Sequence, residues 1–87
     1  MSVKKLAQEI TDLHSRFADY NKKHPGRRFH IIRTGNSNRP QLHWIINEFG
    51  VYDSKSKKYI LAYINHFDAP SAVEEMRELI TSAEKEK

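Results

Sequence analysis

The sequence predicts one α+β domain, with a three-stranded antiparallel meander and two helices in the order α-β-β-β-α. Apolar residues recur at helical spacing near both ends of the chain, and the middle alternates with the period of a strand. Short polar loops separate the alternating segments, which is typical of an antiparallel meander. A chain of 87 residues has the length of one domain, so we treat residues 1–87 as a single unit.

The first predicted helix begins after Ser2, whose hydroxyl can cap its first turn. Its apolar residues are spaced alternately by three and four, which places them on one face. The sequence His24-Pro25-Gly26 ends the helix, because proline disfavours helical backbone in the residue before it and glycine permits a turn. The apolar face comprises Val3, Leu6, Ile10, Leu13, Phe17 and Tyr20.

Three strands are predicted over residues 27–34, 41–51 and 59–67, with loops at 35–40 and 53–58. The second helix follows Pro70, and Ser71 with Glu74 matches a capping box. Its first turns are acidic, as the helix dipole favours. We expect residues 84–87 to be frayed. The apolar stripe of this helix comprises Val73, Met76, Ile80 and Ala83, with Leu79 at its margin.

The predicted sheet has two apolar faces, although an antiparallel sheet with one wet face should be polar on that side. We expect the core to include Phe29, Ile31, Leu42, Trp44, Ile46, Ile60, Ala62 and Ile64. The second face then carries Ile32, Ile45, Phe49, Tyr59, Leu61 and Tyr63. Three explanations are open: the helices cover opposite faces, the second face contacts a protein or a second copy, or bases stack on it.

Charge is distributed unevenly along the chain, whose net charge is +4. Residues 22–41 hold six Lys or Arg and no Asp or Glu, whereas residues 68–87 hold six acidic and three basic residues. A basic segment favours nucleic acid through phosphate contacts. We therefore expect RNA or DNA to contact Arg27, Arg28, Arg33, Arg39, Lys55, Lys57 and Lys58, with His30, His43, Tyr59 and Tyr63 as stacking groups. Arg39 is predicted to lie apart from the patch that Arg27, Arg28 and the lysines form.

The alternative is a protein-binding adaptor or inhibitor of the kind that phages and mobile elements encode. In this hypothesis the second sheet face contacts a host protein, or a second copy in a homodimer. Its contact residues are Ile32, Ile45, Phe49, Leu61 and Tyr63.

The residues give little support for catalysis. The chain has no cysteine, and no pair of its histidines has the i, i+4 spacing of a helical metal site. We therefore predict a non-catalytic protein without a metal or cofactor. No apolar run is long enough to span a membrane, and the first residues lack the apolar run of a signal peptide, so we expect a cytoplasmic location.

The element order resembles that of double-stranded-RNA-binding domains and of the small RNA-cleaving toxins that share their fold. The resemblance implies RNA as a partner and, for the toxins, a strand histidine that His43 matches by position. A lysine cluster opens the last helix of the RNA-binding domains, whereas this chain reads Asp68-Ala69-Pro70-Ser71-Ala72-Val73-Glu74-Glu75 there. An RNase that uses His43 is therefore the least favoured hypothesis.

Overall fold

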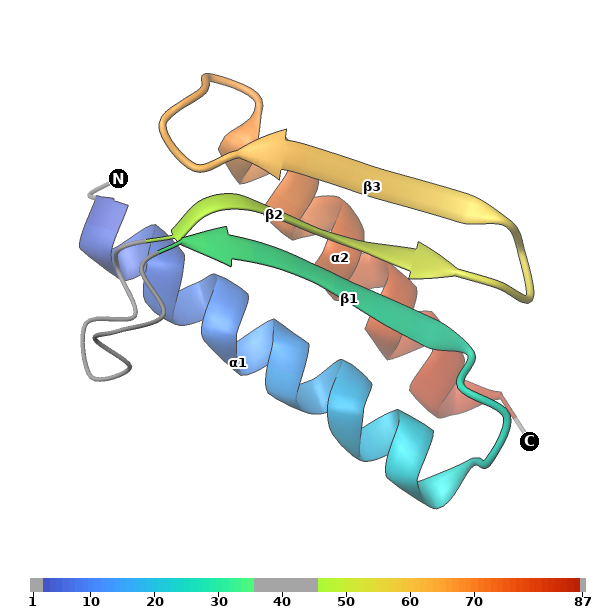
Figure 1. The fold of residues 1–87 in the computed structure, drawn as a ribbon. Coiled ribbons are helices and arrows are strands. Elements are labelled where there is room, and N and C mark those ends of the chain that lie inside the picture. Colours follow the sequence, from blue (N-terminus) through green and yellow to red (C-terminus); the bar gives the residue numbers. More distant parts are fainter. Residues whose placement is uncertain (1–2, 36–45, 87) are drawn as a thin grey trace.

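The computed structural model describes residues 3–35 and 46–86, which form one compact α+β domain (Figure 1). The order of elements is α1 (Val3–Lys23), β1 (Phe29–Gly35), β2 (Ile46–Asp53), β3 (Lys58–Tyr63) and α2 (Ala69–Lys85). The predicted order α-β-β-β-α is confirmed. Among the described residues, no helix has both the length and the apolar character that crossing a membrane requires.

The three strands form one antiparallel sheet in the order β1-β2-β3, so β2 is central and the other two are edges. Both helices lie on the same side of this sheet and pack against each other (Figure 1). The explanation in which the helices cover opposite faces is therefore wrong. The other side of the sheet, which we call the open face, is not covered by any described element.

The core lies between the sheet and the two helices, as the helical stripes predict. The sheet contributes Phe29, Ile46, Phe49, Val51, Ile60, Ala62 and Ile64. The helices contribute Leu6, Ile10, Leu13 and Phe17 from α1, and Val73, Met76, Ile80 and Ala83 from α2, together with smaller side chains. Ile31 was predicted to be in the core, but it lies on the edge strand β1 and is exposed.

A β-bulge in β2 changes which residues face the core. Thr34 is opposite Glu48 but Gly35 is opposite Ile46, so Asn47 is an extra residue without a partner in β1. A bulge shifts the alternation of side chains by one residue, and both Ile46 and Phe49 point to the helices. The prediction that Phe49 lies on the second face is wrong for this reason. Leu42, Trp44 and Ile45 lie outside the described residues.

The boundaries of all three strands and of the second helix differ from those predicted. Strand β3 ends at Tyr63 rather than residue 67, and α2 begins at Ala69. Ser71 therefore lies inside α2 and does not cap it, while the N-cap residue, Asp68, makes no side-chain capping bond. At the other end, where we expected fraying, α2 continues to Lys85 and the Glu86 carboxylate binds Arg28.

The open face of the sheet as candidate site

Three rows of side chains cross the open face, and the strand register fixes their members. The first row is His30, Tyr52 and Tyr59. The second row is Ile32, Gly50 and Leu61, and the third row is Thr34, Glu48 and Tyr63. Three of these side chains are largely exposed, at 59% for Tyr59, 43% for Leu61 and 57% for Tyr63. The prediction that these three residues lie on the second face of the sheet is confirmed.

The first row is a continuous line of aromatic rings. The ring centroids of His30 and Tyr52 are 5.9 Å apart, and those of Tyr52 and Tyr59 are 6.1 Å apart. Tyr52 was missed in the sequence because the second strand was ended at residue 51. Had the alternation of the second strand been extended by two residues, Val51 and Asp53 would have been assigned to the core and Tyr52 to the open face. An aromatic row on an uncovered sheet offers ring faces to a flat ligand such as a base.

The middle row has a glycine at its centre. A Cβ atom on Gly50 would lie 1.9 Å from the carbonyl oxygen of Ile60, so no other residue fits without moving the backbone of β3. Ile32 and Leu61 flank this position and contribute apolar surface. The open face is therefore aromatic at one end and aliphatic at its centre.

Basic residues lie at the end of the sheet that carries the aromatic row. The turn between β2 and β3 contains Lys57 and leads into Lys58, directly before Tyr59. Lys58 is opposite Asp53, so it lies on the side of the sheet that carries the helices. Arg27 precedes β1 at the same end of the sheet, because Arg28 and Ser54 are joined by a backbone hydrogen bond of 2.9 Å. Arg27, Lys57 and Lys58 are exposed and form no ion pair with a described residue. They are available to an anionic ligand.

Arg28, which the sequence placed in the nucleic-acid interface, is occupied by other contacts. Its Nε and Nη2 atoms donate to the two carboxylate oxygens of Asp53 at 2.9 and 3.1 Å. Its Nη1 atom donates to Glu86 at 2.8 Å and to the Tyr20 hydroxyl at 3.2 Å. The Arg28 side chain is only 13% exposed. Arg28 therefore ties together β1, β2, α1 and the end of α2, and we correct its assignment to the interface.

Asp53 is the buried partner in this cluster, with an exposed fraction of 0%. Burial raises the pKa of its carboxyl, but hydrogen bonds from Arg28, Ser56 and the Lys55 backbone outweigh that effect, so the pKa lies below its ordinary value. The Lys55 ammonium binds Glu86 at 3.2 Å, so this lysine is partly neutralised. Of the five basic residues predicted to form one patch, Arg27, Lys57 and Lys58 remain as charges without an ion pair to the described part of the chain.

The remaining predicted residues do not join the aromatic row. Arg33 is opposite Phe49 and so lies on the side of the sheet that carries the helices. Its charge contributes to lowering the pKa of His14, although burial is the larger cause. Arg39, His43 and Ile45 lie outside the described residues.

His14 is a buried histidine on α1, and its Nε2 atom lies 3.0 Å from the carbonyl oxygen of Gly50. Because the carbonyl can only accept, Nε2 carries the proton and donates. Nδ1 has no hydrogen-bond partner among the described residues. With its pKa lowered by burial, the imidazole is neutral and holds α1 against the centre of the sheet.

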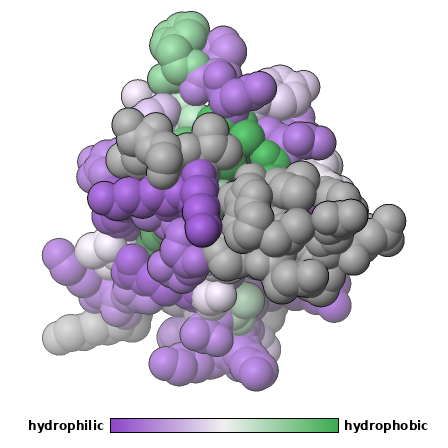
Figure 2. Space-filling view, turned by 90° about the vertical axis from the view of Figure 1, so that its left-hand side faces the viewer, coloured by the Kyte–Doolittle hydropathy of each residue, from purple (hydrophilic) through white to green (hydrophobic). Residues whose placement is uncertain are grey.

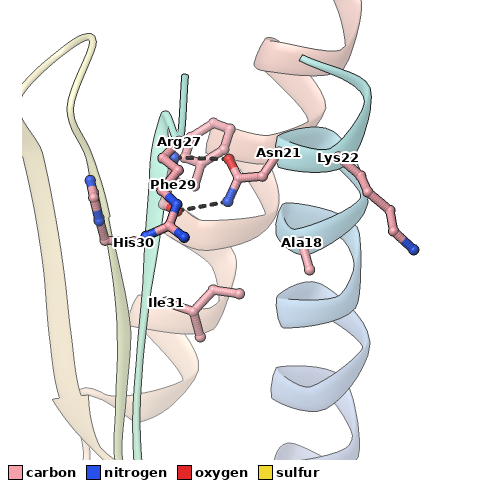
Figure 3. Close-up of a pocket in the computed structure, with 7 residues that line it drawn as sticks. All are labelled: Ala18, Asn21, Lys22, Arg27, Phe29, His30 and Ile31. Atoms are coloured by element: carbon pink, nitrogen blue, oxygen red, sulfur yellow. Dashed lines mark hydrogen bonds between the residues drawn. The ribbon is translucent and has the colours of Figure 1, made fainter. Parts of the chain in front are cut away.

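A shallow hollow lies beside the edge strand β1 and is lined by residues of α1 and β1 and by Arg27 from the connection between them (Figure 3). Asn21 reaches across it and makes two hydrogen bonds to the backbone of Phe29, accepting from its N–H at 3.1 Å and donating to its carbonyl at 2.8 Å (Figure 3). The side-chain amide thus takes the place of a neighbouring strand at this point. The hollow is a covered strand edge rather than a built ligand site.

The end of the molecule where α1 begins is mostly hydrophilic, with a hydrophobic projection at the top (Figure 2). Phe67, in the connection between β3 and α2, is 84% exposed and contacts only the neighbouring ring of His66 among the aromatic residues described.

Within the described ranges, no group of three or more His, Cys, Asp or Glu residues could hold a metal ion. Comparisons with protein-family models, with curated proteins and with solved structures gave no match to this chain.

Proposed function

We propose that this protein binds single-stranded nucleic acid across the open face of its sheet. In this proposal bases stack on His30, Tyr52 and Tyr59, and phosphates contact Arg27 and Lys57. The observation that carries the proposal is the aromatic row on an uncovered sheet, whose end also carries two exposed cations that no described carboxylate pairs. Aromatic platforms bordered by positive charge are a general solution for binding single strands.

A flexible single strand suits this surface better than a duplex. The row presents ring faces, which unpaired bases can reach but stacked base pairs cannot. The start of α2, where the RNA-binding domains of similar element order have lysines, is acidic here and would repel a duplex backbone. The resemblance in element order therefore supports RNA as a candidate ligand without supporting the duplex mode of binding.

The stacking part of the proposal predicts that Tyr59→Ala weakens binding to a labelled single strand by about 1–3 kcal/mol, because one base can no longer stack. Phe67→Ala is the matched control, since it removes an exposed aromatic ring that is not in the row. Fluorescence anisotropy with an RNA and a DNA oligonucleotide of mixed sequence measures both variants. Equal affinities of the two variants would exclude the row, and no binding by the wild type at low salt would end the proposal.

The electrostatic part concerns the dependence of binding on salt. Replacing Lys57 with Gln should reduce the log–log salt slope by about 0.7 if this lysine neutralises one phosphate of the single strand. Arg33→Gln is the control, because it removes an exposed cation from the other side of the sheet. A slope that falls equally in both variants would contradict the assignment of Lys57.

The second candidate function is binding of a protein partner, such as the host protein targeted by an adaptor or inhibitor. The observation that favours it is the aliphatic middle row of Ile32, Gly50 and Leu61, which cannot stack on bases. Apolar contacts depend little on salt, so a partner captured at high ionic strength in nuclease-treated lysate, and not captured by Ile32→Asp, would support this function instead.

A further inference from the structure

The outer edge of β3 is an unpaired strand edge with apolar side chains. Ile60 and Ala62 are opposite Val51 and Phe49, and Ile64 donates from its backbone N–H to the carbonyl of Asn47 at 2.9 Å. In an antiparallel ladder, residues that exchange bonds with a neighbour alternate with residues whose N–H and C=O groups point outward. The outward groups of β3 therefore belong to Tyr59, Leu61 and Tyr63. No described element lies beyond this edge (Figure 1).

The two sheet edges differ in how they are protected. At β1, the side-chain amide of Asn21 satisfies the outward backbone groups of Phe29. At β3, the Tyr63 carbonyl accepts from the His66 N–H at 3.1 Å, and no hydrogen bond within the described residues caps the outward groups of Tyr59 and Leu61 or the N–H of Tyr63. A carbonyl oxygen has two lone pairs, so that of Tyr63 can accept a second bond. The side chains at the outward positions are Tyr, Leu and Tyr rather than the charges or prolines that commonly block strand pairing. The β3 edge is thus open to another strand.

The sequence of β3 suits pairing with itself. Tyr59-Ile60-Leu61-Ala62-Tyr63 has an aromatic residue at each end, smaller apolar residues inside them and leucine at its centre. If two copies pair antiparallel about Leu61, this residue meets itself, and Tyr59 meets Tyr63 of the second copy. These are the residues with outward backbone groups, so each pair exchanges two hydrogen bonds.

Charge also favours the antiparallel arrangement. Lys57 and Lys58 lie at one end of β3, and the acidic start of α2, with Asp68, Glu74 and Glu75, follows the other end. Antiparallel pairing keeps the lysines of the two copies apart and brings them toward the acidic end of the neighbouring copy. Parallel pairing would bring the lysines together.

We propose that the protein forms a two-fold symmetric homodimer by antiparallel pairing of its β3 edges, which creates a continuous six-stranded sheet. The two-fold axis is perpendicular to the sheet, so both open faces lie on one side and all four helices lie on the other. The row of His30, Tyr52 and Tyr59 then continues into Tyr63 of the second copy. This inference concerns the free protein and does not depend on whether a nucleic acid binds.

The test is analytical ultracentrifugation from about 10 µM to 1 mM, because a single strand edge buries less area than a standard interface and the dimer is weak. We expect the wild type to reach twice the mass of one chain. Leu61→Lys should be a folded monomer, since two like charges meet on the axis. Ile32→Lys, which adds the same charge in the same row of the open face but away from β3, should still dimerise.

An equimolar mixture of Leu61→Lys and Leu61→Glu provides the decisive measurement. Because position 61 meets its own copy, each variant alone should stay monomeric and the mixture should dimerise. A wild type that stays monomeric at the highest concentration, a dimer abolished by Ile32→Lys but not by Leu61→Lys, or a mixture that does not dimerise would each overturn the proposal.

Hydrogen exchange on the wild type gives a test free of substitutions. The amides of Tyr59, Leu61 and Tyr63 point outward in the single chain and are bonded across the axis in the dimer, so they should exchange more slowly as the protein concentration rises. Exchange rates independent of concentration would overturn the proposal.

Discussion

Arg28→Ala should destabilise the fold by about 3–5 kcal/mol at neutral pH, because it leaves the Asp53 carboxylate buried without its cation. The neighbouring Arg27→Ala is the matched control, since Arg27 is exposed and makes no described ion pair, and it should change stability by no more than about 0.5 kcal/mol. Urea denaturation of the two variants and the wild type measures the difference. Equal effects of the two substitutions would show that the Arg28–Asp53 pair does not stabilise the fold.

The effect of Arg28→Ala should depend on pH in a direction that identifies Asp53. In the wild type the pKa of Asp53 is lowered. Its contribution to the free energy of unfolding is therefore fully present above the ordinary value of 3.8 and is lost as the pH falls through the lowered pKa of the folded protein. Without Arg28, burial raises the pKa, and protonation relieves the cost of the buried charge. The difference in the free energy of unfolding between the wild type and Arg28→Ala should therefore become smaller as the pH is lowered. A difference that does not change with pH would contradict this account.

Phe49→Ala should lower the free energy of unfolding by about 3–5 kcal/mol, whereas Leu61→Ala should lower it by less than about 1 kcal/mol in dilute solution. Both residues were assigned to the same face from the alternation of the sequence, but Phe49 is 0% exposed and Leu61 is 43% exposed. Truncation of a buried ring leaves a cavity in the core, while truncation of an exposed side chain leaves none. Similar losses for the two variants in thermal melts would contradict the face assignment that the bulge produces.

Much of the fold follows from local patterns that the sequence displays. The spacing of Leu6, Ile10, Leu13 and Phe17 determines the buried face of α1, and alternation in β3 separates Ile60 and Ala62 from Tyr59 and Leu61. Each of these assignments depends on the periodicity of a single segment, helical for α1 and alternating for β3, so the sequence alone could predict it. The position of Asn47 opposite a gap in β1 depends on two strands at once, and no local pattern reveals it.

The site was predictable only in part for a similar reason. Exposure of Tyr59 and Tyr63 follows from alternation, but the neutralisation of Arg28 depends on Asp53, Tyr20 and Glu86, which are distant in the sequence. A charge looks available in a sequence whether or not a distant carboxylate binds it. The total of positive residues therefore overstated the basic surface, while the aromatic row was understated because Tyr52 was left outside the strand.

The bulge at Asn47 makes one position of β2 dispensable for directing side chains to the core. Substitution of Asn47 alters a side chain that contacts solvent, and drift at this position carries little penalty. Deletion of the same residue would place Ile46 directly before Glu48, and regular alternation would still direct Ile46 toward the core. If Asn47 stayed but entered the regular ladder, Ile46 would turn toward the open face instead. Distant relatives should therefore either keep the bulge with any residue at position 47 or lack that residue, and both forms bury the residues that correspond to Ile46 and Phe49.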